Sequence, residues 1–143
     1  MLFKRISRAQ PEVVYVVARN VSGGTLTAGY AAVWDTGASA DGVRVTQSTT
    51  AALQAFAGVA DTDIASNDYG LLQVYGYRSS IRIYSSTGSS AAGDNLSTVN
   101  AQWGLLPSAS GGTAKAFGFL CAAVTASSSS QYLTTAAAFI RAL

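Results

Sequence analysis

The sequence predicts an all-β protein: a single antiparallel β-sandwich or barrel-like domain with an extended N-terminal arm. Short runs of β-branched and aromatic residues recur along the chain. Clusters of Gly, Ser, Asn and Asp separate these runs, at a typical spacing of about ten residues. Helical periodicity is weak throughout, and 143 residues suffice for one domain with its own core. We therefore divide the chain into an arm, residues 1–11, and a β domain, residues 12–143.

The strongest strand signal lies in residues 56–83. Turn residues interrupt it at Ser66-Asn67-Asp68 and again at Ser79-Ser80, so the pattern predicts strand, turn, strand, turn and strand. The apolar and aromatic residues that carry the signal are Tyr69, Leu71, Leu72, Val74, Tyr75, Tyr77, Ile81 and Ile83.

Shorter strands are expected on either side of this stretch. Residues 12–18 are apolar on both strand faces, which suits a strand covered on both sides or one that pairs away from its own domain. Residues 25–35 form a strand with a kink at Ala28-Gly29, and residues 116–124 form one with Phe117 and Phe119 on a shared face. Alanine would permit short helices at 49–57 and 134–141, but the surrounding Ser, Thr and Gly favour strands.

Three segments share a loose pattern in which small residues form a corner just before a strand. Recurrent hairpin corners explain this pattern, because the spacing is too irregular for a solenoid. The segments begin at Leu26 (LTAGY), Ile64 (IASNDY) and Ser90 (SAAGD).

The chain carries little charge: 49% of its residues are hydrophobic and 11% are charged. Soluble surfaces usually carry roughly 25–35% charged residues, so this composition indicates a surface covered by partners or, alternatively, a solvated surface rich in Ser and Thr. Lys4, Arg5 and Arg8 precede the first acidic residue. They leave six basic against seven acidic residues in the rest of the chain, a net charge of −1. A basic arm on a near-neutral body predicts an electrostatic tether.

No apolar run approaches the roughly 20 residues of a membrane-spanning helix, so we expect no membrane contact. The basic start is followed by Pro11 and Glu12 and by no cleavage site, which predicts synthesis and retention in a cytoplasm. The single cysteine, Cys121, lies in an apolar run and is expected to be buried and inert.

Catalytic and metal-binding patterns are missing from the sequence. There is no histidine, which removes Ser-His-Asp and Cys-His arrangements and the commonest zinc ligands. Asp61 and Asp63 could hold calcium or act as paired carboxylates, but no ligand ladder accompanies them, so a solvated turn is the better interpretation. Tyr75, Tyr77 and Arg78 could mimic a base-stacking platform, although packing is the safer default. We therefore expect no enzyme, no cofactor and no direct nucleic-acid binding.

Taken together, several segments resemble the small decoration (cement) proteins of tailed-bacteriophage capsids. The resemblance covers most of residues 12–143 and is one of pattern and composition. It departs at the first corner, which has Gly29-Tyr30 where an Ala-Gly-Asp corner recurs later. The segments are VSGGTLTAG at residues 21–29, GVADTDIA at 58–65, DYGLLQVYGY at 68–77, AGD at 92–94 and AFIRAL at 138–143.

The resemblance implies a β-rich domain, often trimeric, on the outer surface of an icosahedral head. Its role would be to clamp neighbouring major capsid proteins against internal DNA pressure. The arm lies outside the matched part, so its role is our own hypothesis. We expect its apolar residues and its cations to contact the capsid. The alternative is a tail that makes no fixed contacts. The residues of this candidate capsid-binding site are Leu2, Phe3, Lys4, Arg5, Ile6 and Arg8.

Three other functions stay open at this point. The chain could be a head- or tail-fibre knob that recognises host glycan, with Trp34, Trp103 and the tyrosines as a sugar-stacking surface. It could be a nucleic-acid-associated protein that uses the basic arm, or a structural subunit of the tail or head–tail connector.

Overall fold

The computed structural model describes residues 12–37, 39–85, 89–108, 116–125 and 132–142, and these residues form nine strands and one short 3-10 helix. The all-β prediction is confirmed. In the described part of the chain, no helix is long and apolar enough to cross a membrane. The strands are β1 (Val14–Asn20), β2 (Ala31–Trp34), β3 (Arg44–Thr46), β4 (Phe56–Ala60), β5 (Tyr69–Ser85), β6 (Asn95–Thr98), β7 (Leu105–Ser108), β8 (Gly118–Leu120) and β9 (Tyr132–Arg141), with the helix at Thr50–Ala52.

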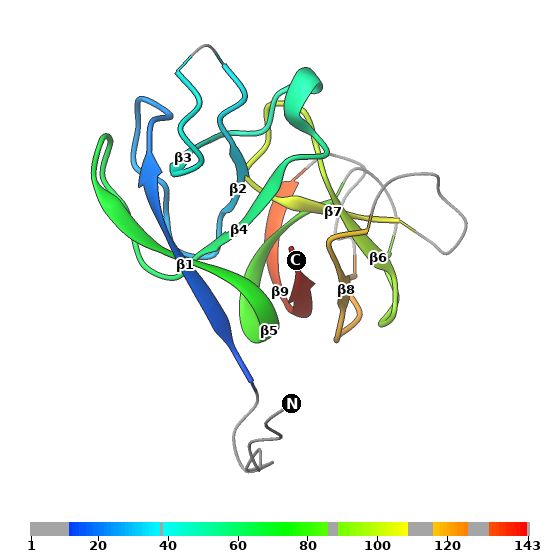
Figure 1. Ribbon diagram of the computed structural model, residues 1–143. Coiled ribbons are helices and arrows are strands. Elements are labelled where there is room, and N and C mark those ends of the chain that lie inside the picture. Colours follow the sequence, from blue (N-terminus) through cyan, green and yellow to red (C-terminus); the bar gives the residue numbers. More distant parts are fainter. Residues whose placement is uncertain (1–11, 38, 86–88, 109–115, 126–131, 143) are drawn as a thin grey trace, which may run out of the picture.

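Strand pairing closes one mixed sheet on itself twice. β1 pairs with β3, β3 with β2, β2 with β4 and β4 with β5, and β5 returns to β1. β5 then pairs with β7, β7 with β6, β6 with β8 and β8 with β9, and β9 returns to β5. The result is a first ring, β1–β5, and a second ring, β5–β9, that share the 17-residue strand β5. Figure 1 shows the long green β5 passing between the two groups of strands.

The two rings have the same topology. In each ring the first and third strands run parallel (β1 with β3, β5 with β7), and the other pairings are antiparallel. The expectation of a purely antiparallel sheet is therefore wrong at these two places. The parallel pairs arise because the first and third strands of each ring become neighbours when the ring closes.

Equivalent hydrogen bonds recur at the same places in both rings. An isolated bridge joins Leu26 to Ile64 in the first ring, and another joins Ser90 to Val124 in the second. Because Leu26 and Ser90 begin two of the three similar corners, those corners are equivalent parts of a repeated topology.

A second pair of bonds extends this match. The Ala60 N–H donates to Tyr30 O at 2.9 Å, and the Leu120 N–H donates to Asp94 O at 2.9 Å. These equivalent bonds align β4 of the first ring with β8 of the second.

Two hydrophobic clusters fill the described part of the molecule, one for each ring. The first contains Ala18, Val45 and Leu72 among others, and lies within the first ring. The second contains Ile81, Ile83 and Leu120, together with Phe56 and Val59 from the first ring. β4 is consequently buried along its whole length, because one side faces its own ring and the other packs against the second ring.

The central stretch differs from the sequence prediction at one of its two turns. The turn at Ser66-Asn67-Asp68 is confirmed, with Asn67 at a φ of 69°. The predicted turn at Ser79-Ser80 is wrong, because β5 runs through both serines. The pairing of β5 with β9 instead shifts register between Arg78 and Ile81, so the small exposed serines form an irregularity within a continuous strand.

Two predictions around β8 are wrong for a common reason. The strand covers only Gly118–Leu120, so its neighbours are not held to strand alternation. Phe117 therefore packs inward against Phe56, with ring centroids 5.0 Å apart, while Phe119 is exposed. Cys121 lies in the bend after the strand and is exposed, not buried.

Candidate functional site

The exposed large apolar side chains of the described residues lie on one continuous face of the sheet. They belong to β1, to the first half of β5 and to β8, and half-buried Phe139 of β9 joins them. We call these seven residues the apolar stripe: Tyr15, Val17, Tyr69, Leu71, Tyr77, Phe119 and Phe139.

The first half of the stripe lies on the ladder between β1 and β5. Val17 is directly opposite Leu71, and these side chains are 59% and 43% exposed. The next pair along the ladder is Arg19 with Tyr69. The guanidinium carbon of Arg19 lies 6.0 Å from the centroid of the Tyr69 ring. Cross-strand partners share a face of the sheet, so these four side chains form one surface.

The second half is an aromatic row across β5, β9 and β8. Tyr77 is opposite Phe139, and Phe139 is opposite Phe119. The two phenylalanine rings stack with centroids 5.3 Å apart and planes 9° from parallel. Tyr75 meets the Phe139 ring edge-on at 5.1 Å. These contacts hold the row in a defined shape although its outer atoms face solvent.

A shallow hollow of about 310 Å³ lies between the two halves of the stripe. Tyr15 and Tyr77 of the stripe stand at this hollow. Polar groups complete its lining: Asp61, Gln73, Arg78, Ser79 and Ser80, together with Val13.

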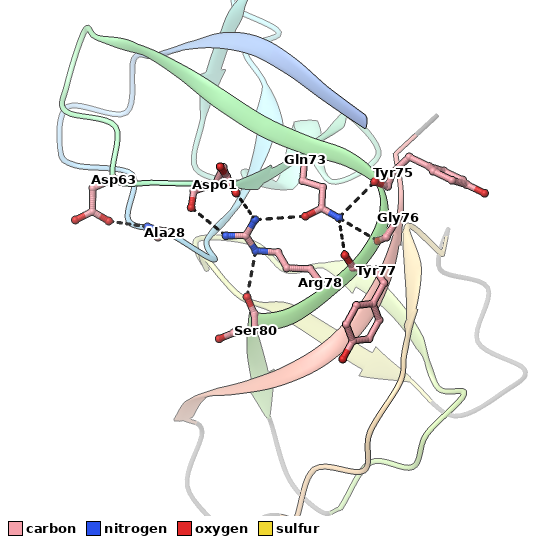
Figure 2. Close-up of polar contacts among 9 residues, drawn as sticks. All are labelled: Ala28, Asp61, Asp63, Gln73, Tyr75, Gly76, Tyr77, Arg78 and Ser80. Carbon is pink, nitrogen blue, oxygen red and sulfur yellow. Dashed lines mark hydrogen bonds and ion pairs between the residues drawn. The ribbon is translucent and has the colours of Figure 1, made fainter. Parts of the chain in front are cut away.

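A hydrogen-bond network beneath the hollow supports a bend in β5 (Figure 2). Gly76 has a φ of +105°, and a Cβ there would lie 2.2 Å from the Glu12 carbonyl oxygen. Only glycine accepts both conditions. The buried Gln73 amide nitrogen donates to the carbonyl oxygens of residues 75, 76 and 77 at 3.3, 3.1 and 3.2 Å. The amide therefore satisfies backbone groups that the bend exposes.

Arg78 joins this network to the end of β4. Its Nη1 lies 2.8 Å from Asp61 Oδ1 and donates to Gln73 Oε1 at 3.3 Å. Its Nη2 donates to the Asp61 carbonyl oxygen at 3.1 Å, and its Nε donates to Ser80 O at 3.2 Å. Every guanidinium nitrogen therefore has a protein partner. The charge of Arg78 is matched by Asp61, and the other described residues of the lining contribute hydroxyl, amide, aromatic and aliphatic groups.

The residues predicted to bind the capsid are not placed by the structure. Leu2, Phe3, Lys4, Arg5, Ile6 and Arg8 all lie outside the described residues. The first described residues, Glu12 and Val13, lie beside the hollow, because Val13 lines it and the Glu12 carbonyl faces Gly76. The N-terminal end of the described chain therefore lies next to the stripe.

The residues of the two alternative sites suggested by the sequence lie in two separate places. Trp103 stacks on Tyr30 with centroids 5.7 Å apart, and both pack with Trp34 against the first cluster. Tyr77 is exposed, but Arg78 is engaged with Asp61, so they form no free stacking platform.

The two carboxylates of the predicted solvated turn have separate structural roles. Asp61 pairs with Arg78, and Asp63 Oδ1 accepts a hydrogen bond from the Ala28 N–H at 2.8 Å. Asp63 thereby ties the second corner to the first, and neither carboxylate is merely solvated. Among the described residues, no group of three potential metal-ligating side chains occurs.

Sequence reasoning missed the apolar stripe, although signals for it were present. Residues 12–18 are apolar on both faces, and residues 69–77 place large side chains at alternate positions. Neither pattern shows which face stays open. That depends on the pairing of β1 with β5, which joins segments about 50 residues apart.

Comparison with known proteins finds a shared fold with a phage head-fibre component. No protein-family model matches the chain, and no curated protein matches it. Among solved structures, the crystal structure of the N base of the head fibre protein gp8.5 from bacteriophage phi29 is similar, with a TM-score of 0.53 and 17% identity. The similarity covers 92% of this chain and 96% of that chain. The two chains therefore share an overall fold over most of this chain and nearly all of the N-base chain.

Proposed function

We propose that this chain is a structural protein of a bacteriophage virion, attached to the outside of the head. The observation that carries the proposal is the fold shared with the phi29 head-fibre base over 92% of this chain. The resemblance to capsid decoration proteins points independently to the same location. An exposed apolar stripe on a chain with only 11% charged residues also suits a protein that works inside an assembly.

Within this class we favour a cement role. The domain would sit on the outer face of the icosahedral head as a homotrimer and clamp neighbouring major capsid proteins against DNA pressure. Leu2, Phe3 and Ile6 would supply apolar anchors, and Lys4, Arg5 and Arg8 would meet acidic patches on the capsid. The role requires no enzymatic activity, no cofactor, no membrane and no direct contact with nucleic acid.

A second candidate, the base of a head fibre, is favoured by the nature of the structural neighbour itself. A fibre base would also bind the head, but it would carry a receptor-binding element instead of stabilising the shell. Both candidates predict binding to capsids, and they differ in what is lost when the protein is removed.

Co-sedimentation with capsids stripped of the protein tests the shared part of the proposal. We expect saturable binding at a fixed ratio to the major capsid protein. A well-folded protein that does not bind would overturn the proposal. Deletion of residues 2–8 should lower capsid occupancy, and unchanged occupancy would remove the arm from the binding site.

Measurements on virions with and without the protein separate the two candidates. A cement protein should raise the temperature at which heads release their DNA, with little effect on adsorption to host cells. A fibre base should affect adsorption and leave the DNA-release temperature unchanged.

A further inference from the structure

We propose that the apolar stripe, centred on Phe119 and Phe139, is the surface through which copies of this chain bind one another. The proposal specifies a self-association surface, and it does not depend on whether the partner of the assembled protein is a capsid. Three properties of the described residues support it: the repeat of the two rings, the amount of exposed apolar surface, and the distribution of charge.

Comparison of the two rings shows that the position of the Phe119–Phe139 pair has an equivalent in the first ring, and that this equivalent position is covered. In the first ring Val59 is opposite Gln73, next to the pair Ala60 and Leu72. In the second ring Phe119 is opposite Phe139, next to the pair Leu120 and Ala138. The equivalent hydrogen bonds of Ala60 and Leu120 confirm this alignment.

The two equivalent positions differ sharply in burial. Val59 is 0% exposed and Gln73 is 2% exposed, because Val59 packs into the cluster of the second ring and Gln73 lies under the Arg78 network. Phe119 is 42% exposed, since within the described residues no third ring packs against that flank. The second ring thus places two large stacked phenylalanines where the first ring places smaller, covered groups. Large apolar side chains on an uncovered flank indicate that another molecule covers it.

The exposed area suits a protein–protein contact. The six most exposed stripe residues are each between 41% and 64% exposed. With about 200 Å² for a large side chain, the stripe presents on the order of 500–600 Å² of mainly apolar surface. The polar hollow divides this surface into two halves, and together they approach the roughly 800 Å² that each partner contributes to a standard interface.

The charged groups along the stripe that have no ion-pair partner are two cations, and both lie beside tyrosine residues. Arg19 lies over Tyr69, and the exposed Arg141 is opposite Tyr75. Arg78 is already neutralised by Asp61. The surface therefore combines two cations with exposed tyrosine faces, and two copies can pair these groups reciprocally through cation–π contacts. The described residues of this surface present no dense field of one sign, as a polyanion-binding surface would.

Sedimentation velocity of the full-length protein over a concentration series tests the proposal. We expect the wild type to form a defined oligomer. Phe119→Lys should raise the dissociation constant by at least about 30-fold, as loss of a central interface residue does. The double variant Val17→Lys/Leu71→Lys probes the other half of the stripe without touching the phenylalanine stack and should act in the same direction.

Ala51→Lys, on the exposed face of the 3-10 helix, is the matched control because it adds the same charge outside the stripe and should assemble as the wild type does. Near-UV circular dichroism establishes that each variant is folded. A wild type that remains monomeric, or stripe variants that assemble as tightly as the control, would overturn the proposal. A monomeric wild type that binds stripped capsids, and loses that binding in the stripe variants, would reject self-association and leave the proposed function standing.

Discussion

Arg78 and Asp61 form an ion pair at the point where the first ring passes into the second, with Nη1 and Oδ1 2.8 Å apart. Arg78 lies in the middle of β5, just before the register shift, and Asp61 directly follows β4. The pair therefore ties the end of one strand of the first ring to the strand that both rings share. Gln73 connects the pair to the bend at Gly76, so one network stabilises the junction.

Replacement of Arg78 by alanine should lower the free energy of unfolding by about 2–3 kcal/mol. The variant leaves Gln73 Oε1 without its partner and removes the charge that matches Asp61. The side chains of Arg78 and Asp61 are 16% and 35% exposed, so solvent limits the loss. Urea unfolding at a fixed protein concentration measures the change.

Arg82→Ala provides a control on the same strand. Arg82 lies 5.8 Å from the Tyr30 ring centroid, a contact expected to contribute about 0.5–1 kcal/mol. Equal losses for the two variants would show that the junction network has no special contribution.

Gly76→Ala should destabilise the protein by more than about 3 kcal/mol and change the pairing of β1 with β5. The new Cβ would combine an unfavourable φ of +105° with a 2.2 Å approach to the Glu12 carbonyl oxygen. Gly93→Ala is the matched control, because its φ is +95° but a Cβ there meets nothing within 4 Å. Its cost should be about 1 kcal/mol, from backbone strain alone. Thermal unfolding measures the stability of both variants. A lower midpoint temperature for Gly93→Ala than for Gly76→Ala would contradict the prediction.

Asn20→Ala should cost about 3 kcal/mol or more. Asn20 is fully buried at the end of β1, and its amide nitrogen donates to Gly24 O at 2.7 Å and Ile64 O at 2.8 Å. Its side-chain oxygen accepts from the Ser22 N–H at 3.0 Å. Removal of the amide takes one hydrogen bond from each of these carbonyl groups and leaves the Ser22 N–H without its side-chain acceptor, at a buried position. Asn100→Ala, at an exposed position, should be nearly neutral in the same denaturation experiment.

Asp41 should titrate below its ordinary pKa of 3.8. The Val43 N–H donates to its carboxylate at 2.9 Å and is the main cause of the lowered pKa, helped by the Arg44 N–H and the Arg44 charge. Because the folded-state pKa is lowered, the contribution to stability is present above the unfolded pKa. It is lost as the pH falls through the folded pKa, in a window below about pH 4.

Carboxyl chemical shifts measured by NMR test this directly. In the variant Asp41→Asn, the part of the loss of folding stability at low pH that comes from protonation of Asp41 should disappear. A midpoint for Asp41 at or above 3.8 would contradict the hydrogen-bonded turn.

The sequence by itself determined the all-β class and several of its turns. Alternating apolar residues such as those of residues 69–77, and turn residues such as Ser66-Asn67-Asp68, act within a few positions of the chain, so their signal is local and readable. The corner at Ala28-Gly29 is local in the same way. The lack of histidine likewise limits the chemistry open to any fold of this chain.

Tertiary structure alone decided how the strands close and which face stays open. Sequence alternation assigns side chains to two faces but does not say which face is covered, because that depends on partners far along the chain, such as Val17 with Leu71. The same long-range pairing carries β5 through Ser79-Ser80, where local turn preference predicted a break, because the ladder with β9 absorbs the irregularity. The junction network and the stacking of Phe119 on Phe139 follow from that closure, since each joins residues that only the folded rings bring together.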